Sequence, residues 1–489
     1  MRNTPESRLL ALLLVVGFAV SPALATCGGG GGGGVGGMNS SNNTNDAVVY
    51  RVPWRVIAPQ DPPPSAGLVL YWFPASNDEV QRSSLRESRA LTLYAAQCVS
   101  MAVADVKTPA ARQLVGDSKP PVAVLATYDG KALGKLENTN GMLKVAQVEK
   151  LVETEMKKRE DAVDQNLKDG KDKAKTGDSE GAIKLLSAVA DEKCMFPKKA
   201  KEATGELKKL GVKGIAAASP ETFPAPSFDR RVGARIISTM REGLRAEMAG
   251  RYVEAGRLYS LAHRIDPADP VPLRFLGELY RHQTGEWEKA RAAFDTLLSM
   301  PADPLSRAVA LHGLGKMTIH EGEFKKGLAL MEQSVAEFPL ALAYRNLAVY
   351  WNSEGDAEKT AMYVKKGLDL DPKDSFNRVF AAVFLAASGR KDEALKIARA
   401  NRQLLPASYN LAAIYAQAGR RDEALALLRR HFFRYERYQS VRAKEMMEAR
   451  VDAVFDSIRD DRTFVALTSG ADGRLPVPMR QTNAGTNDR

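Results

Sequence analysis

The chain has 489 residues, of which 44% are hydrophobic, so it is long enough for two or three domains with substantial cores. It carries 70 basic and 59 acidic residues, a net charge of +11, but the two signs are interspersed as on the solvated faces of helices. We therefore expect no nucleic-acid partner. Three cysteines are too few for a fold held together by a framework of disulfides.

Residues 1–26 have the features of a secretory signal peptide. Arg2 and Arg8 precede an apolar run from Leu9 to Val20. This run is about 12 residues long, whereas a membrane-spanning helix needs roughly 20. The sequence therefore predicts an exported protein.

Residues 24–27, with the sequence LATC, resemble a bacterial lipobox, in which a signal peptidase cuts before the cysteine and the thiol receives a diacylglyceryl group. Thr26 departs from the family's preference for Gly, Ala or Ser. The resemblance implies lipidation at Cys27, and the Gly/Asn-rich residues 27–47 would form a flexible tether. The alternative is simple secretion after cleavage at Ala25. We expect a location in the cell envelope, as a periplasm-facing outer-membrane lipoprotein attached through the lipid, or else a secreted protein.

Residues 48–160 change to the pattern of a mixed α/β domain. The order strand, helix, strand, helix, hairpin, helix and the segment KPPVAVLATYDGKALGKLE resemble the thioredoxin fold. In that resemblance Pro121 takes the place of the family's cis-proline. The strands are expected at 68–73, 99–106, 122–127 and 133–136, with a helix at 83–97 and a closing helix at 143–158.

The cysteines argue against thioredoxin chemistry. Active thioredoxins carry Cys-x-x-Cys at a helix start, where this chain has Ser76 and Glu79. Disulfide exchange needs a reactive thiolate and a second thiol, so we predict a redox-inactive domain. Cys98 lies in an apolar strand pattern and is expected to be a small buried hydrophobic residue, the alternative being a working thiol. If Cys27 is lipidated, Cys98 and Cys194 are the only pair left for an intramolecular disulfide.

Residues 161–212 are rich in Lys, Asp and Glu but keep a helical pattern. Gly170 and Gly177 are seven residues apart and Ala182 follows five later, which predicts a helical hairpin like a degenerate repeat. Residues 213–230 contain the proline-rich stretch AAASPETFPAPSF and are expected to be a linker.

Residues 231–432 contain an internal repeat with a period close to 34 residues. The copies combine a turn glycine with small residues where two helices cross, and all but the last end in a proline, as in AGRYVEAGRLYSLAHRIDPADP. The motif resembles the tetratricopeptide repeat (TPR) in about six copies, which implies a superhelical solenoid of helical hairpins. The turn glycines are Gly250, Gly285, Gly322, Gly355, Gly389 and Gly419.

The stretch RRHFFRYERYQSVRAKE at the end of the array is both basic and aromatic. It is either a patch for anionic lipid or nucleic acid, or a capping helix whose aromatic side chains pack inward. We favour the cap, because the ends of a solenoid need one. Capping helices are expected at 433–468 and a disordered tail at 469–489. The predicted fold class is α+β multidomain, with an α/β thioredoxin-like domain followed by an all-α solenoid.

No catalytic constellation is recognisable. The five histidines lack metal-ligand spacing, the poly-Gly run precedes no strand-to-helix motif, and no serine elbow occurs. The sequence predicts a binding protein rather than an enzyme, without cofactor or metal.

In the TPR family the first helix of each hairpin lines the concave face and holds ligands beside the small crossing residue. The resemblance implies a groove for a protein or peptide partner, and the charged forks and amides at these places suit an acidic one. We therefore predict an exported, membrane-tethered interaction scaffold. The alternative is an envelope thiol-redox or folding factor that recruits clients through its repeats. The groove residues are Arg274, Glu278, His312, Lys316, Arg345, Asn346 and Asn410.

Overall fold

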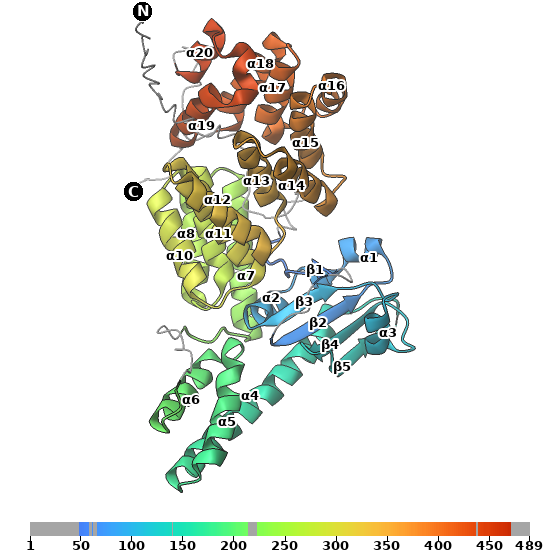
Figure 1. Cartoon of the computed structure of the whole chain (residues 1–489), viewed down its shortest axis with the longest axis vertical. Coiled ribbons are helices and arrows are strands. Elements are labelled where there is room, and N and C mark those ends of the chain that lie inside the picture. The colour runs from blue at the N-terminus through green and yellow to red at the C-terminus, as the bar shows by residue number, and fades with distance from the viewer. Residues whose placement is uncertain are drawn as a thin grey trace, which may run out of the picture.

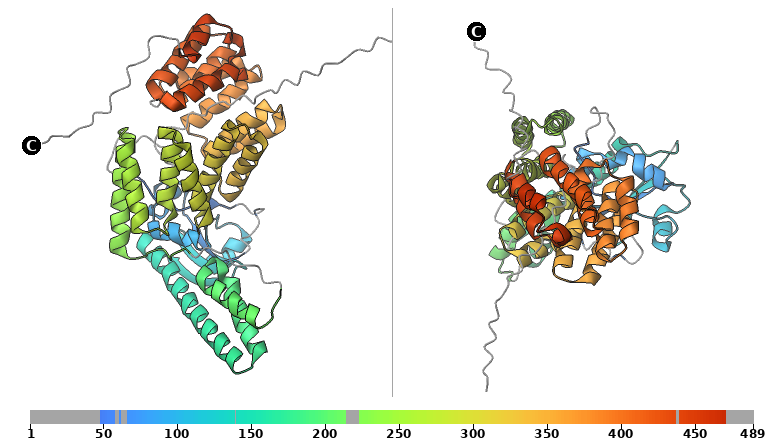
Figure 2. Two further views of the ribbon diagram at one scale, coloured as in Figure 1. Left: turned by 90° about the vertical axis from the view of Figure 1, so that its left-hand side faces the viewer. Right: turned by 90° about the horizontal axis from the view of Figure 1, so that it is seen from above.

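The computed structural model describes residues 48–57, 61, 66–138, 140–213, 223–436 and 439–470. A small mixed sheet lies between a long helical hairpin and a larger helical array, and the C-terminal helices lie at the far end of the array (Figure 1, Figure 2). The predicted signal peptide and tether, and the predicted tail beyond residue 470, lie outside the described residues. Within the described part, no helix is both long and apolar enough to cross a bilayer.

The sheet has five strands in the order β1-β3-β2-β4-β5. β2 runs parallel to β3, whereas β4 pairs antiparallel with both β2 and β5. The peptide bond before Pro121 is cis, as the sequence predicts. The strands are β1 (Arg55–Val56), β2 (Leu68–Phe73), β3 (Val99–Val103), β4 (Val122–Thr127) and β5 (Ala132–Glu137).

The helical segment after β2 is not the single helix expected at 83–97. It consists of α1 (Asn77–Arg82), a 3-10 turn η2 (Ser84–Arg86) and α2 (Arg89–Ala96), and α3 (Pro109–Val115) follows β3. The side chains of Ser76, Ser83 and Ser88 each accept a backbone hydrogen bond at the start of one piece. Three successive N-caps therefore break the segment.

α4 (Val145–Lys175) is 31 residues long, so the expected helix end at 158 is wrong. Val148 and Val152 pack in the core of the sheet, and Val163 and Leu167 pack against the next helices. One continuous apolar face of α4 thus packs against both hydrophobic cores. Gly177, at φ 86°, makes the turn into α5 (Ser179–Asp191), and α6 (Pro197–Lys209) packs on α5 as a third helix.

Cys98 and Cys194 form a disulfide with their Cα atoms 5.9 Å apart, so the expectation of a free, buried Cys98 is wrong. The bond joins the start of β3 to the 3-10 turn η3 (Glu192–Cys194). Met195 packs in the core of the sheet, which brings the neighbouring cysteine within reach of Cys98. The two cysteines are 96 residues apart in the chain.

Six helical hairpins form the array, in agreement with the repeat pattern. All six predicted turn glycines have positive φ, between 69° and 95°. Gly277 and Gly313 lie on opposite sides of the Phe294 ring, where an added Cβ would collide with it. The helices are α7 (Arg230–Met248), α8 (Tyr252–Ile265), α9 (Pro270–Glu278) with the π-helical turn η4 (Leu279–Thr284), α10 (Trp287–Ser299), α11 (Pro304–His320), α12 (Phe324–Glu337), α13 (Ala341–Ser353), α14 (Ala357–Leu370), α15 (Ser375–Ala387), α16 (Lys391–Ala400), a 3-10 turn η5 (Leu405–Ala407), α17 (Ser408–Gln417) and α18 (Arg421–Arg430).

The C-terminal segment caps the array. It comprises the π-helical turn η6 (His431–Tyr435), α19 (Gln439–Val451), the 3-10 turn η7 (Ala453–Ile458) and α20 (Arg462–Thr468). Phe432, Phe455 and Phe464 are fully buried in one core with α17 and α18, as expected for a cap. α19 also contacts η4 in the second hairpin, so the cap reaches back along the array.

Candidate functional site

Residues 48–52, which belong to no helix or strand, lie against the first helices of the array. Val49 and Tyr50 are each 3% exposed and share a hydrophobic core with residues of α7, α9 and α11. The hydroxyl of Tyr50 donates a 2.6 Å hydrogen bond to Asp269, and Arg274 donates to the carbonyl of Val49 at 3.3 Å. The chain's own N-terminal segment therefore occupies part of the face where the sequence predicts a partner.

Arg89 in α2 connects the same place to the sheet domain. Its Nε lies 2.8 Å from Asp269, its Nη2 is 2.5 Å from Asp266, and its Nη1 donates to the carbonyl of Ser227 at 2.7 Å. All three charged side chains are buried. This guanidinium of the sheet domain therefore binds acceptors in the array and in the segment that precedes it.

The charges at this junction perturb one another. Burial alone would lower the pKa of Arg89, but Asp269, Tyr50 and Asp266 together outweigh burial, so that the pKa is raised. Burial raises the pKa of Tyr50 well above its usual value, and the charge of Asp269 adds to the effect. Tyr50 thus remains a neutral hydrogen-bond donor.

Arg55 in β1 makes a second contact between the sheet domain and the array. Its Nη2 donates to the carbonyl of Glu337 at 2.9 Å, and also to the carbonyl of Ala336, at the end of α12. A cation at the C-terminus of a helix meets carbonyl groups that have no partner within the helix. The sheet domain thereby also contacts the third hairpin of the array.

Four of the predicted groove residues form hydrogen bonds between the first helices of successive hairpins. Each bond joins residues 32 or 34 positions apart, which is one repeat. Arg274, His312 and Asn346 are at most 5% exposed, and Arg345 is half-buried. The bonds are Arg274 to Ser306 at 3.3 Å, His312 to Asn346 at 2.7 Å, and Arg345 to Asn377.

The remaining predicted groove residues also lie on first helices of hairpins, but they form none of these three hydrogen bonds. Glu278 is half-buried and accepts two hydrogen bonds from Arg281, at 2.8 and 2.9 Å. Asn410 in α17 is 3% exposed, and its amide nitrogen has no hydrogen-bond partner among the described residues. Lys316 is half-buried in α11. An external partner would have to displace residues 48–52 to reach Arg274.

Comparison with known proteins identifies the repeat. A family model described as "Tetratricopeptide repeat" matches residues 273–308 and 407–431. The chain contains tetratricopeptide repeats. The matched segments cover α9 with α10 and α17 with α18, so the TPR array of the sequence analysis corresponds to the observed hairpins.

One curated relative shares part of the sequence. Over 97 residues, 20% of this chain, the sequence is 30% identical to the protein CTR9 homolog of Arabidopsis thaliana. The matched stretch covers only 9% of that protein's length.

Two solved structures of TPR proteins are also similar. One is YrrB, described as a TPR protein with an unusual peptide-binding site, with 22% identity, a TM-score of 0.25, and coverage of 36% of this chain and 90% of that one. The other is a tetratricopeptide repeat protein from Parabacteroides merdae, with 16% identity, a TM-score of 0.30, and coverage of 48% of this chain and 100% of that one.

The sequence analysis did not predict the residues that pack on the first hairpins of the TPR array or the buried group at its C-terminal cap. Tyr50 and Arg89 carry no motif, because their partners lie about two hundred residues away in a different domain. His431 meets Glu436 and Glu445 in a buried group, at spacings that match no metal motif. The only signal for this group was the unusual mixture of aromatic and charged residues at the end of the array.

Proposed function

We propose that the protein is an interaction scaffold whose TPR array holds a peptide segment on its first helices. The observation that supports this is the burial of Val49 and Tyr50 on that face, with a backbone carbonyl and a tyrosine hydroxyl as the recognised groups. A partner peptide would use the same contacts after displacing the chain's own segment. Binding of an extended segment by backbone and side-chain hydrogen bonds together is a common mode of peptide recognition.

The sequence of residues 48–52 suggests which peptides the first hairpins bind. Residues 48–52 are apolar apart from Arg51, and the groups that face them include the carboxylate of Asp269. An acidic partner therefore fits better farther along the array, beside Arg345 and Asn410. Binding of an acidic partner there is expected to weaken as the salt concentration rises.

The experiment uses the full chain and a fluorescein-labelled peptide with the sequence of residues 46–54, DAVVYRVPW. Tyr50→Ala removes the ring and hydroxyl that hold the segment, so this variant is expected to bind the added peptide more tightly than the wild type does. Tyr128→Ala is the matched control, because Tyr128 is 49% exposed on the turn of the sheet hairpin. Adding Arg274→Ala to Tyr50→Ala should weaken binding again. If a folded Tyr50→Ala variant binds the peptide no better than the wild type does, the first helices do not hold a peptide at this place.

The sheet domain is proposed to be a thioredoxin-like module without redox activity. At the position of the missing cysteines, Ser76 caps α1 and the carboxylate of Glu79 accepts hydrogen bonds from the Trp72 indole and the Ala75 amide. These are structural roles. Cys98 is paired with Cys194, so the alternative of a thiol-redox or folding factor requires this partly exposed bond to be its redox centre. Insulin reduction by the wild type that Cys98→Ser abolishes would favour the alternative.

Export and membrane attachment through Cys27 are further parts of the proposal. The disulfide supports export, because such bonds persist mainly in oxidising compartments. Cys27→Ala is expected to release the protein from membranes without changing its fold, since lipoproteins of this type are held by several acyl chains. Wild-type protein found entirely in the soluble fraction after gentle lysis would contradict the tether.

A further inference from the structure

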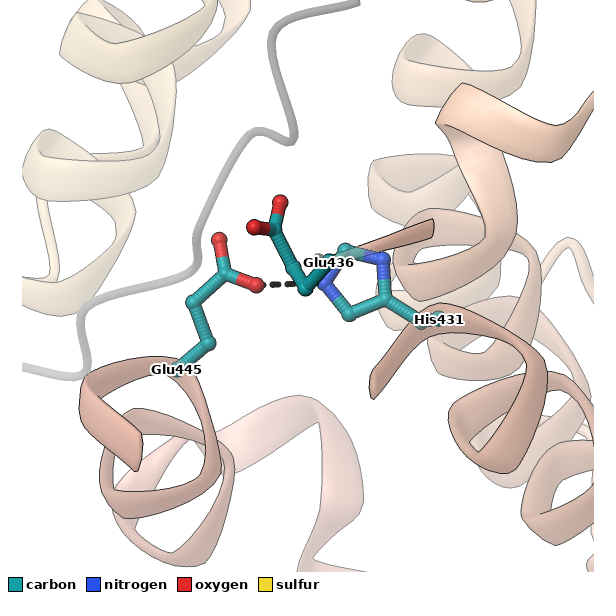
Figure 3. Close-up of side chains that lie close together, drawn as sticks. All are labelled: His431, Glu436 and Glu445. Atoms are coloured by element: carbon teal, nitrogen blue, oxygen red, sulfur yellow. Dashed lines mark hydrogen bonds and ion pairs between the residues drawn. The ribbon is translucent and has the colours of Figure 1, made fainter. Parts of the chain in front are cut away.

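Three potential ligand side chains meet at the junction between the last TPR hairpin and its cap. One ligand atom each from His431 in η6, Glu436 just after it and Glu445 in α19 lie within 4.8 Å of one another (Figure 3). Nε2 of His431 is 2.7 Å from the carboxylate of Glu445. The group thus gathers a nitrogen and two carboxylates from separate turns of the chain.

All three side chains are buried, with exposed fractions of 0% for His431, 6% for Glu436 and 5% for Glu445. The Glu436 carboxylate has no hydrogen-bond or ion-pair partner among the described residues, although it faces the other two side chains (Figure 3). Lys316 and Arg442 lie near enough to act on its charge but form no ion pair with it within the described part of the chain. Two buried carboxylates side by side are unfavourable unless a cation or a proton neutralises them.

Aromatic side chains hold the imidazole in place, and its Nδ1 has no hydrogen-bond partner among the described residues. Tyr435 stacks on it with ring centres 5.4 Å apart, and Tyr409 and Phe432 meet it edge-on at the same distance. The ring belongs to a π-helical turn, a local distortion that is frequent at functional sites. Packing therefore presets the direction of Nε2.

We propose that His431, Glu436 and Glu445 bind one divalent transition-metal ion. A nitrogen ligand with two carboxylates suits Zn²⁺ and, next to it, Mn²⁺ or Fe²⁺, whereas Ca²⁺ and Mg²⁺ prefer oxygen alone. The ion would replace the hydrogen bond between His431 and Glu445 and neutralise both carboxylates. Three protein ligands leave at least one coordination position for another group.

The site has a structural consequence for the array. Glu445 belongs to α19, which contacts both η6 at the end of the array and η4 in its second hairpin. An ion shared by η6 and α19 would fix the cap in this position. Binding that occurs only in the folded state stabilises that state, so the ion is expected to raise the melting temperature.

The test uses untagged full-length protein treated with EDTA and then dialysed. Titration with Zn²⁺ against a chromogenic chelator is expected to give one bound ion per chain and a higher melting temperature. Co²⁺ should give visible absorption bands typical of mixed nitrogen and oxygen ligands. Glu436→Gln and Glu445→Gln keep the side-chain shape, and each is expected to lose Zn²⁺ binding at concentrations that saturate the wild type.

Glu448→Gln is the matched control, because Glu448 lies in the same helix, is 4% exposed and contacts His320 outside the group. This variant should bind Zn²⁺ as the wild type does. Folded, EDTA-treated wild-type protein that binds neither Zn²⁺ nor Mn²⁺ would overturn the proposal, and would leave a proton as the neutralising charge. Equal Zn²⁺ binding by the wild type and both glutamine variants would overturn it too, since the ion would then lie elsewhere.

Discussion

Arg89 in the sheet domain and Asp269 in the TPR array form an ion pair 2.8 Å long, although they are 180 residues apart in the chain. The Asp269 oxygen that accepts from Arg89 also accepts from the Tyr50 hydroxyl. One carboxylate thus connects the sheet domain, the N-terminal segment and α9. The two parts of the molecule are joined through buried, fully paired charges rather than through an apolar contact alone.

Loss of Arg89 is expected to be costly. Arg89→Met leaves Asp266 and Asp269 buried without their partner and should lower the free energy of unfolding by about 3–5 kcal/mol. Urea unfolding followed by circular dichroism measures the change. Adding Asp266→Asn and Asp269→Asn to the same chain should recover part of the loss, because the unpaired charges are then gone.

Arg82 provides the control for Arg89. Its ion pair with Asp78 is 3.8 Å long and lies on the surface, so Arg82→Met is expected to change stability by no more than about 0.5 kcal/mol. Equal effects of Arg82→Met and Arg89→Met would contradict a special role for the buried pair.

The close crossing at Phe294 makes a second prediction. A Cβ at residue 277 would collide with the Phe294 ring, so Gly277→Ala should destabilise the array by about 1–3 kcal/mol. Gly205→Ala is the control, because nothing lies within 4 Å of a Cβ there and alanine favours a helix. Phe294→Leu in the Gly277→Ala chain should restore part of the stability. Equal melting temperatures of Gly277→Ala and Gly205→Ala would contradict this packing.

The disulfide predicts an effect of reduction. The bond closes a loop across 96 residues, so removing it with Cys194→Ser should cost about 2–4 kcal/mol. Dithiothreitol should lower the melting temperature of the wild type and leave that of Cys194→Ser unchanged. Thiol titration of unfolded, unreduced protein should find no free thiol at Cys98 or Cys194, and two free thiols there would mean that the bond does not form.

His312 predicts a loss of stability in acid. Burial, helped by the positive charges of Arg281, Lys316 and Arg345 and opposed by Glu278, lowers the pKa of His312 to about 3. Its Nε2 accepts a hydrogen bond from the Asn346 amide, which protonation would break. Between about pH 3 and 6.5 the unfolded chain therefore binds more protons than the folded one.

Stability should consequently fall as the pH drops through that window. His312 alone accounts for about 2 kcal/mol between pH 7 and pH 5. Urea unfolding of the wild type and of His312→Gln at both pH values measures this contribution. The glutamine can still accept from Asn346, and its pH dependence should be smaller by that amount; an equal dependence in both proteins would assign the effect to other groups.

The array could be predicted from the sequence because its determinants are local. Each hairpin pairs helices that are adjacent in the chain, so turn glycines such as Gly250 and crossing residues such as Gly277 recur with the period of the repeat. Four of the five strands could also be predicted from apolar runs and turns, whereas the two-residue strand β1 was not expected. Helix ends were harder, since α4 continues through residue 160 on packing against two cores.

Only the tertiary structure decided which residues meet at the candidate sites. Tyr50 reaches Asp269 across 219 residues, Cys98 meets Cys194 across 96, and His431 meets Glu445 only because the cap folds back onto the array. Each of these contacts depends on how two separately folded parts pack together. No local period or spacing encodes that packing, so residue types alone placed Arg274 and His312 on an open groove, whereas packing buried both.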